Sequence, residues 1–314
     1  MADNEHWERE LVTRLATAAL KEQRRARLWG IFFKLLGFTY LTVILLLALG
    51  WTGHADVTGK KHTALVDLDG IIAPDGDGSA DKITASLDAA FEDKNTKGVV
   101  LRINSPGGSP VQAQTIYDEM RRLRKKYPDV PLYVVVEDIC ASGGYFVAAG
   151  ADRIYVGKAS LVGSIGVLMN GFGFTGLMDK LGIERRLITA GEHKGFLDPF
   201  SPEKESEVQY ARQLAEEIHQ QFIAVVREGR GKRLKETPDM FSGLIWSGQK
   251  SIELGLADAV GSLDSVARDV IKAEDVVDYT EKQNIAERVA KRFGATAASS
   301  FAQALLRSSV PAPR

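Results

Sequence analysis

Residues 98–110 read GVVLRINSPGGSP, and residues 132–145 read LYVVVEDICASGGY. In each stretch, a nearly continuous apolar run of strand length leads into a glycine-rich turn, and a helix-forming segment follows at once. Strands that are apolar throughout lie inside a sheet, and a repeated strand-helix order is typical of parallel strands joined by crossover helices. The two stretches therefore predict an α/β core.

The same alternation continues on both sides of these stretches. We expect further strands at 63–72 and 153–156 and helices at 83–93, 111–126 and 143–151, with crossover helices on both faces of the sheet. Later segments predict a glycine-rich stretch at 162–174, a helix near 175–181, a strand at 184–189, a long amphipathic helix at 203–230, and a helix followed by a strand edge at 246–261.

An apolar segment precedes this body. Residues 35–51 carry no charge, and extension back to Trp29 gives a stretch close to the roughly 20 residues that a helix needs to cross a bilayer. More basic residues precede the segment than follow it, which indicates a cytoplasmic N-terminus. A cleaved secretory signal is the alternative, because Ala48 and Gly50 resemble a small-x-small cleavage site.

These patterns divide the chain into five parts. They are a cytoplasmic segment at 1–28, a transmembrane helix at 29–51, a linker at 52–61, a folded body at 62–275, and a C-terminal amphipathic helix with a fraying tail at 276–314.

Composition excludes several classes of function. The 314-residue chain contains 40 basic and 41 acidic residues, so its net charge is -1. Such a balance gives no general attraction to polyanions, and we expect no nucleic-acid partner. Cys140 is the only cysteine, which excludes an intramolecular disulfide and a cysteine zinc cluster. We expect no metal and no cofactor, and we interpret Cys140 as a packed apolar residue.

Ser142 lies where the second quoted strand meets its helix. Its hydroxyl is expected close to the unpaired amide hydrogens of the helix start, which can stabilise an oxyanion. Gly107 and Gly108 form the corresponding turn after the first strand, and two glycines allow backbone amides to face a bound group. Simpler explanations remain open, since Ser142 can cap the helix and Pro-Gly-Gly can be a tight turn.

A nucleophilic serine needs a base. His193 and Lys194 lie in a loop after the predicted strand at 184–189, and either can serve. A histidine titrates in a suitable range, whereas a lysine must be desolvated to lose its proton near neutral pH. A triad of Ser142, His193 and Asp198 is therefore one alternative. His219 lies in the charged helix and is expected to be solvated.

Four blocks resemble the SppA-type signal peptide peptidases in content and order: INSPGGSP at 103–110, CASGGYFVAAGADRIY at 140–155, VGSIGV at 162–167 and AGEHKGFLDPFSP at 190–202. The resemblance covers roughly residues 62–270 and implies a membrane-bound serine protease with a ClpP/crotonase-like fold. It makes Ser142 the nucleophile and Lys194 the general base, with Ser164 hydrogen-bonded to the lysine amine. It also assigns the oxyanion hole to the amides of Gly108 and Gly143.

The resemblance further implies substrates, partners and location. The family's short members degrade cleaved signal peptides and other hydrophobic peptides, and they assemble into a homo-oligomeric ring, for which we suspect an octamer. Their sites join the serine of one protomer to the lysine of its neighbour. The catalytic domain is expected on the periplasmic side of a bacterial inner membrane, which the single helix crosses.

The glycine-rich edges at Gly107 and 163–166 predict how a peptide binds. They can pair with an extended substrate through backbone amides, and Ile165 and Val167 are expected to line an apolar pocket. An inactive membrane scaffold of the same fold, which binds partner helices, is the alternative from another functional class.

Overall fold

The computed structural model describes residues 2–48 and 59–281. The chain divides into two units, and the N-terminal one contains the helix α1 (Ala2–Ala48). Within α1, the span Leu20–Leu45 contains an 18-residue window with a mean hydropathy of 1.8, and it is long and apolar enough to cross a membrane. The predicted segments 1–28 and 29–51 thus belong to one continuous helix as far as Ala48.

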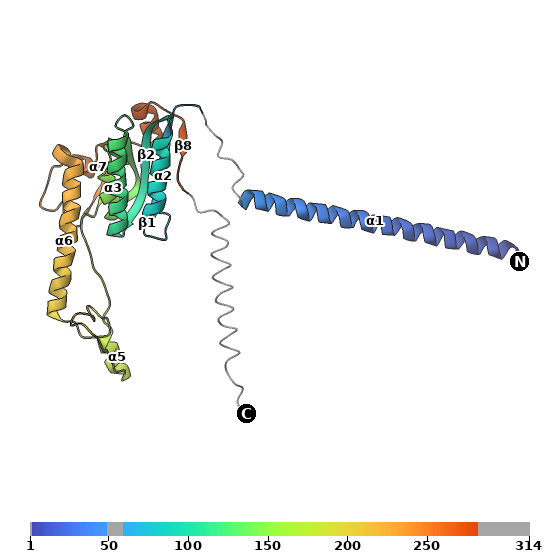
Figure 1. Ribbon diagram of the computed structural model, residues 1–314, viewed down its shortest axis with the longest axis horizontal. Coiled ribbons are helices and arrows are strands. Elements are labelled where there is room, and N and C mark those ends of the chain that lie inside the picture. The colour runs from blue at the N-terminus through green and yellow to red at the C-terminus, as the bar shows by residue number, and fades with distance from the viewer. Residues whose placement is uncertain (1, 49–58, 282–314) are drawn as a thin grey trace. The chain divides into compact units, whose positions relative to one another are not determined.

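The second unit, between Val57 and Lys282, is an α/β body whose elements alternate along the chain (Figure 1). Its strands are β1 (His62–Ile72), β2 (Thr96–Gly108), β3 (Leu132–Ala141), β4 (Arg153–Val156), β5 (Leu161–Gly163), β6 (Ile245–Ser247), β7 (Ala259–Val260) and β8 (Val276–Asp278). Its helices are α2 (Ala80–Glu92), α3 (Pro110–Lys126), α4 (Gly143–Ala148), α5 (Thr175–Leu181), α6 (Glu205–Arg230), α7 (Gly248–Glu253) and α8 (Leu263–Ser265), with a 3-10 turn η1 (Gly231–Arg233) and a π-helical turn η2 (Val266–Ile271).

The described strands form one sheet in the order β6-β5-β3-β2-β1-β8, and β4 lies beside β3 and pairs with β7. All of these strand pairs are parallel except β5 with β6. In a parallel sheet, the carboxyl ends of neighbouring strands lie at one edge. The pairing of Ser105 with Cys140 therefore brings Gly107 and Gly108 at the carboxyl end of β2, here called the glycine turn, beside the Ser142 turn after β3.

The two faces of the sheet are covered differently. Helices α2, α3, α4 and α6 share one core, which includes Leu68 of β1 and Ile116 of α3. On the other face, Leu65 of β1 packs with Val266 of η2. The prediction that crossover helices cover both faces is wrong for α2, α3 and α4. Because β1, β2 and β3 are added in one direction and parallel crossovers are right-handed, their helices lie on the same face.

Local sequence fixes the start of α3 immediately after the glycine turn. The Ser109 hydroxyl accepts a hydrogen bond from the Gln112 amide, and Pro110 occupies the first helical position. Serine is a favoured helix cap, and proline fits the first turn because its missing N–H has no helical acceptor there. These two residues hold the carboxyl end of β2 in place beside β3.

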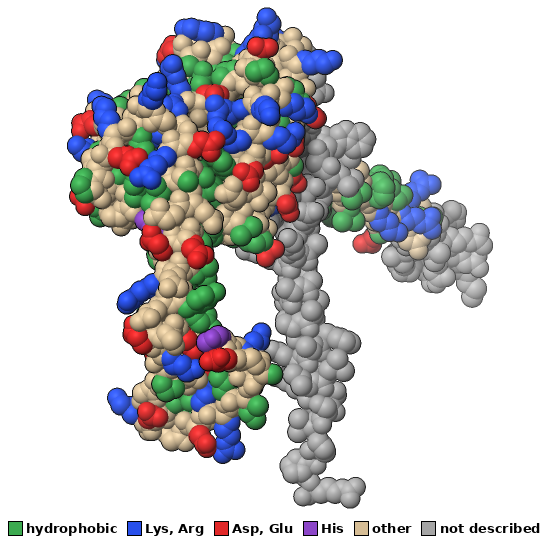
Figure 2. Space-filling model, turned by 60° about the vertical axis from the view of Figure 1, so that its left-hand side comes forward, with side chains coloured by type: hydrophobic (Ala, Val, Ile, Leu, Met, Phe, Trp, Pro, Cys, Tyr) green, Lys and Arg blue, Asp and Glu red, His purple; other side chains and the backbone are tan. Residues whose placement is uncertain are grey.

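Residues 166–204, here called the lobe, lie between β5 and α6 and include α5. In Figure 1, α5 lies at the amino-terminal end of α6, away from the sheet. The predicted strand at 184–189 is wrong, because no neighbouring strand among the described residues pairs with it, and Ile188 is 96% exposed. Leu168 and Phe172 are also largely exposed, and Figure 2 shows hydrophobic side chains on the surface of this part.

The body continues past the predicted boundary at residue 275. Strand β8 pairs in parallel with β1, and the Thr63 amide donates to the Asp275 carbonyl at 2.8 Å. These hydrogen bonds add an edge strand to the sheet, so residues 276–278 belong to the body and not to the predicted C-terminal part. The predicted C-terminal helix after Glu281 and linker residues 52–58 lie outside the described residues.

Candidate active site

Ser142 occupies a strained turn between β3 and α4. Its backbone has a φ of 51° and a ψ of −124°, a region that non-glycine residues rarely adopt and that costs about 1–3 kcal/mol. Among the described residues, the Ser142 hydroxyl makes no capping hydrogen bond to α4. The simple capping role therefore has no support, and the hydroxyl is left available at the edge of the sheet.

The glycine turn at the carboxyl end of β2 packs directly against this serine. A Cβ atom on Gly107, whose φ is +100°, would lie 2.6 Å from the Gly143 nitrogen and 2.8 Å from the Ser142 Cβ. A Cβ atom on Gly143 would lie 3.2 Å from the Gly108 nitrogen. Only glycine fits at Gly107, and its absent side chain lets the backbone at Gly107 and Gly108 pack closely against Ser142 and Gly143. An oxyanion hole requires two amide donors that face one developing charge, and this role of Gly108 and Gly143 stays a prediction.

Ser105, which was not among the predicted site residues, supports the glycine turn. Its buried hydroxyl donates to the Gly70 carbonyl at 2.6 Å and accepts from the Gly107 amide at 3.1 Å. A Cβ atom on Gly144 would lie 3.0 Å from the Ser105 carbonyl oxygen, so α4 also packs closely on this residue. Ser105 thus links β1, the glycine turn and the start of α4.

Ser164 lies beside Ser142. Ala141 pairs with Gly163 in the β3–β5 ladder, so each serine directly follows one member of a paired couple. The Ser142 amide donates to the Gly163 carbonyl at 2.9 Å, and the Ser164 amide donates to the Leu244 carbonyl at 2.7 Å. Ser164 has a φ of 52°, the same unusual region as Ser142.

Two residues near Ser142 differ in what they can offer a substrate. Ile165 was expected to line a substrate pocket, but its side chain is fully buried in the helix-side core, so this expectation is corrected. Only the Ile165 backbone lies at the site edge, because β5 ends beside it. Val167 is partly exposed and stays a predicted lining residue. Cys140 is fully buried, and burial raises the pKa of its thiol, which confirms its interpretation as a packed residue.

Residues 190–202, here called the base loop because they include the expected base Lys194, lie in the lobe and outside the cluster of serines and glycines. Lys194 is exposed, and among the described residues its amine makes no hydrogen bond or ion pair. His193 is exposed as well. Asp198 accepts hydrogen bonds from Ser201 at 2.7 Å and Arg185 at 3.3 Å, and no contact in the described part of the chain joins it to His193. The hydrogen bond from Ser201 is the main reason that the pKa of Asp198 lies below its usual value. This geometry gives no support to a triad of Ser142, His193 and Asp198.

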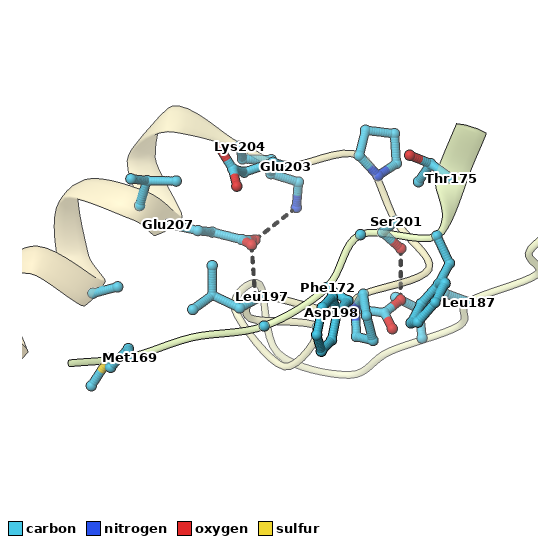
Figure 3. Close-up of a pocket in the computed structure, with 18 of the residues that line it drawn as sticks. Met169, Phe172, Thr175, Leu187, Leu197, Asp198, Ser201, Glu203, Lys204 and Glu207 are labelled. Atoms are coloured by element: carbon cyan, nitrogen blue, oxygen red, sulfur yellow. Dashed lines mark hydrogen bonds and ion pairs between the residues drawn. The ribbon is translucent and has the colours of Figure 1, made fainter. Parts of the chain in front are cut away.

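Glu207, in the first turn of α6, ties the base loop to the helix (Figure 3). Its carboxylate accepts from the Leu197 amide at 3.0 Å and from the Lys204 amine at 3.1 Å. The Leu197 amide, followed by Lys204, lowers the pKa of this buried carboxyl. Leu197 itself has a φ of 50°. The loop that carries Lys194 is therefore attached to α6 through the hydrogen bond between the Leu197 amide and the Glu207 carboxylate.

A cavity of about 760 Å³ lies between the lobe and the first turns of α6. Its lining includes Met169, Phe172, Leu187, Leu197 and Ala215. Ser142, Ser164 and Lys194 do not line it. The cavity is thus formed where the lobe packs on α6, and it does not contain the predicted catalytic residues.

The attachment points on α6 separate the base loop from the serines. Glu207 holds the base loop, whereas the ring of His219 lies 3.2 Å from the Ile165 carbonyl oxygen, next to Ser164. The two residues are roughly 18 Å apart along the helix axis. His219 was expected to be solvated, but its side chain is 20% exposed and has this contact, so that expectation is corrected.

Comparisons with known proteins identify a family. The sequence signature of Peptidase family S49 matches residues 124–277, and that of Clp protease matches residues 69–160. A Synechocystis protein named "Putative protease slr0021" is 31% identical over 206 residues, which cover 65% of this chain and 71% of that protein. The chain belongs to peptidase family S49. The ClpP-like α/β fold predicted from the sequence is confirmed.

Other relatives of this S49 chain match over smaller shares of their length. An Enterococcus faecium protein named "Putative signal peptide peptidase SppA" is 29% identical over 229 residues, 70% of this chain and 66% of that protein. A Brucella abortus protein named "Na(+)/H(+) antiporter NhaA" is 46% identical over 182 residues, 58% of this chain and 25% of that protein. This chain thus spans only a quarter of the length of the Brucella protein, and the name "Na(+)/H(+) antiporter NhaA" refers to that longer protein.

Proposed function

We propose that this chain is a serine endopeptidase in which Ser142 is the nucleophile. One observation carries the proposal: the strained Ser142 makes no capping hydrogen bond among the described residues and lies against a glycine turn that admits no side chain. Strain of this kind persists where surrounding contacts over-determine the backbone, and it is concentrated at active sites. Membership of family S49 agrees with this chemistry.

The proposed reaction is acyl transfer to Ser142 followed by hydrolysis. The Ser142 oxygen attacks the substrate carbonyl while a neutral Lys194 amine takes the hydroxyl proton. The amides of Gly108 and Gly143 donate to the oxyanion that forms, which is usually the largest electrostatic contribution to such a step. The lysine ammonium then gives its proton to the leaving amine, and water hydrolyses the acyl-enzyme in the same way. The Ser164 hydroxyl orients the lysine amine.

The base is supplied by a neighbouring copy of the chain in this proposal. A lysine serves as base only where a low-dielectric surrounding favours its neutral form. Within one body, Lys194 is exposed, and its loop is attached to α6 roughly 18 Å from the attachment beside Ser164. The lobe also exposes Phe172 and Ile188. Burial of these side chains in a homo-oligomeric ring, for which we propose eight copies, gives Lys194 the surrounding that it needs.

The proposed substrates are hydrophobic peptides, including cleaved signal peptides. The glycine-rich edges at Gly107 and around Ser164 can pair with an extended backbone, a mode of binding that tolerates many sequences. Partly exposed Val167 and exposed Leu168 favour apolar side chains beside that backbone. The Enterococcus relative carries the name of a signal peptide peptidase.

A cleavage profile tests the substrate class. We expect the full-length protein in detergent to cleave a peptide library next to aliphatic or small residues, because a charged residue would lose its hydration without a partner. Mass spectrometry of the products identifies the cleaved positions, and Ser142→Ala protein serves as the control. A dominant preference for Lys, Arg, Asp or Glu at the cleaved position contradicts the apolar pocket.

We also propose that α1 anchors the body to a bacterial inner membrane, with the N-terminus in the cytoplasm and the body in the periplasm. The span Leu20–Leu45 supports the anchor, and the basic residues near its amino-terminal end, such as Arg24 and Arg25, support the orientation. Protease added to intact spheroplasts should digest the body. Protection of the body until the cells are lysed contradicts the orientation.

A further inference from the structure

His219 connects α6 to the strand segment that carries Ser164. Its Nε2 lies 3.2 Å from the Ile165 carbonyl oxygen, and its side chain is 20% exposed. A carbonyl oxygen only accepts hydrogen bonds, so Nε2 carries the hydrogen in this contact. The other ring nitrogen, Nδ1, lies 3.9 Å from the Glu216 carboxylate one turn earlier on α6. The ring therefore has a defined orientation toward the strand.

Three contacts hold the segment around Ser164. The Gly163 carbonyl accepts from the Ser142 amide, the Ser164 amide donates to the Leu244 carbonyl, and the Ile165 carbonyl accepts from His219. The first two contacts join backbone atoms, whereas the third comes from a side chain and can be removed by substitution. A residue at φ 52° needs such contacts, because its backbone relaxes when its surroundings no longer determine it.

Close packing on the other sides of this segment means that its remaining backbone movement is limited mainly by the contact with His219. A Cβ atom on Gly163 would lie 2.7 Å from the Trp246 ring, and one on Gly166 would lie 3.1 Å from Gly243. The Ile165 side chain is fixed in the core. Rotation of the peptide plane between Ile165 and Gly166 is thus opposed mainly from the α6 side, where His219 lies.

We propose that His219 is a positioning residue that orients Ser164 through the Ile165 carbonyl. It holds the peptide between Ile165 and Gly166, which limits the movement of the backbone at Ser164 and so the direction of its hydroxyl. His219 takes no proton in the reaction and does not contact Ser142. This role rests on the proposed function, since it matters only if Ser164 orients the catalytic amine.

Substitution of His219 in the full-length protein tests the role. His219→Leu is expected to lower kcat roughly 3- to 10-fold, the effect of one lost neutral hydrogen bond, with KM unchanged within about twofold. His219→Gln retains an N–H donor and is expected to recover most of the lost kcat. Gln220→Leu, at the next position on α6, is the matched control and should keep wild-type kcat. If His219→Leu has a lowered thermal unfolding midpoint, His219→Phe replaces it in this test, because phenylalanine keeps a planar ring and has no hydrogen-bond donor.

A double-mutant cycle with Ser164→Ala separates positioning from a general effect on stability. If His219 acts through Ser164, its replacement has little further effect once the Ser164 hydroxyl is gone, so the two losses are not additive. The positioning role is wrong if His219→Leu and His219→Phe both keep wild-type kcat, or if His219→Gln recovers none of the lost kcat. It is also wrong if the losses of kcat in the His219 and Ser164 variants are additive. An active Ser142→Ala variant overturns the proposed function instead, and the two failures are therefore distinct.

Discussion

Replacement of Ser142 by alanine is expected to abolish peptide hydrolysis and leave the fold intact. Removal of a serine nucleophile lowers kcat by at least about 10⁴-fold, because the remaining site binds substrate but has no attacking oxygen. The fold should survive, since alanine has the same backbone preference as serine at φ 51° and the hydroxyl makes no capping bond that would be lost. Turnover of an apolar peptide and the thermal unfolding midpoint measure the two expectations.

Ser206→Ala is a matched control for this experiment, because Ser206 is an exposed serine at the start of α6. A fluorophosphonate probe should label the wild-type protein and Ser206→Ala at Ser142, and should not label Ser142→Ala. Hydrolysis or labelling that persists in Ser142→Ala would place the nucleophile elsewhere. A wild-type protein that neither cleaves peptides nor reacts with the probe would favour the inactive scaffold.

The sequence predicted the part of the site that is made by the parallel sheet. Apolar runs identified β2 and β3, and parallel strands necessarily bring their carboxyl ends to one edge. The positions of Gly107, Gly108 and Ser142 near one another follow from that rule and from strand order. Ser164 was predicted on resemblance alone, and the pairing of Ala141 with Gly163 places it beside Ser142.

Contacts between distant segments could not be predicted in the same way. A helical pattern shows which face of α6 is apolar, but not what it crosses, so the contact of His219 with Ile165 was missed. Burial of Glu207 depends on the loop that folds over it, which has no repeating pattern. The expected strand at 184–189 failed because a strand needs a neighbour, and among the described residues none pairs with this segment.

Replacement of Lys194 by alanine is expected to abolish hydrolysis to the same extent as replacement of Ser142. Nucleophile and base act as a unit, so the loss of either removes nearly all of their joint contribution. Thermal unfolding should be unchanged, because Lys194 is exposed and its amine makes no contact among the described residues. Lys180→Ala, which removes another exposed lobe lysine, is the control and should keep wild-type turnover. A dead His193→Ala beside an active Lys194→Ala would assign the base to the histidine.

A mixture of the two inactive variants distinguishes a site within one chain from a site between copies. If each site joins Ser142 of one copy to Lys194 of a neighbour, co-expressed Ser142→Ala and Lys194→Ala chains form some sites with both groups intact. Random assembly in a ring with head-to-tail interfaces should restore about one quarter of wild-type activity. A site completed within one chain gives no activity in any mixture. Glu207, which holds the base loop, and His219, which contacts Ile165 beside Ser164, are roughly 18 Å apart along α6. Lys194 could reach Ser142 of its own chain only after a large movement of the lobe. We therefore expect activity in the mixture, from sites formed between copies.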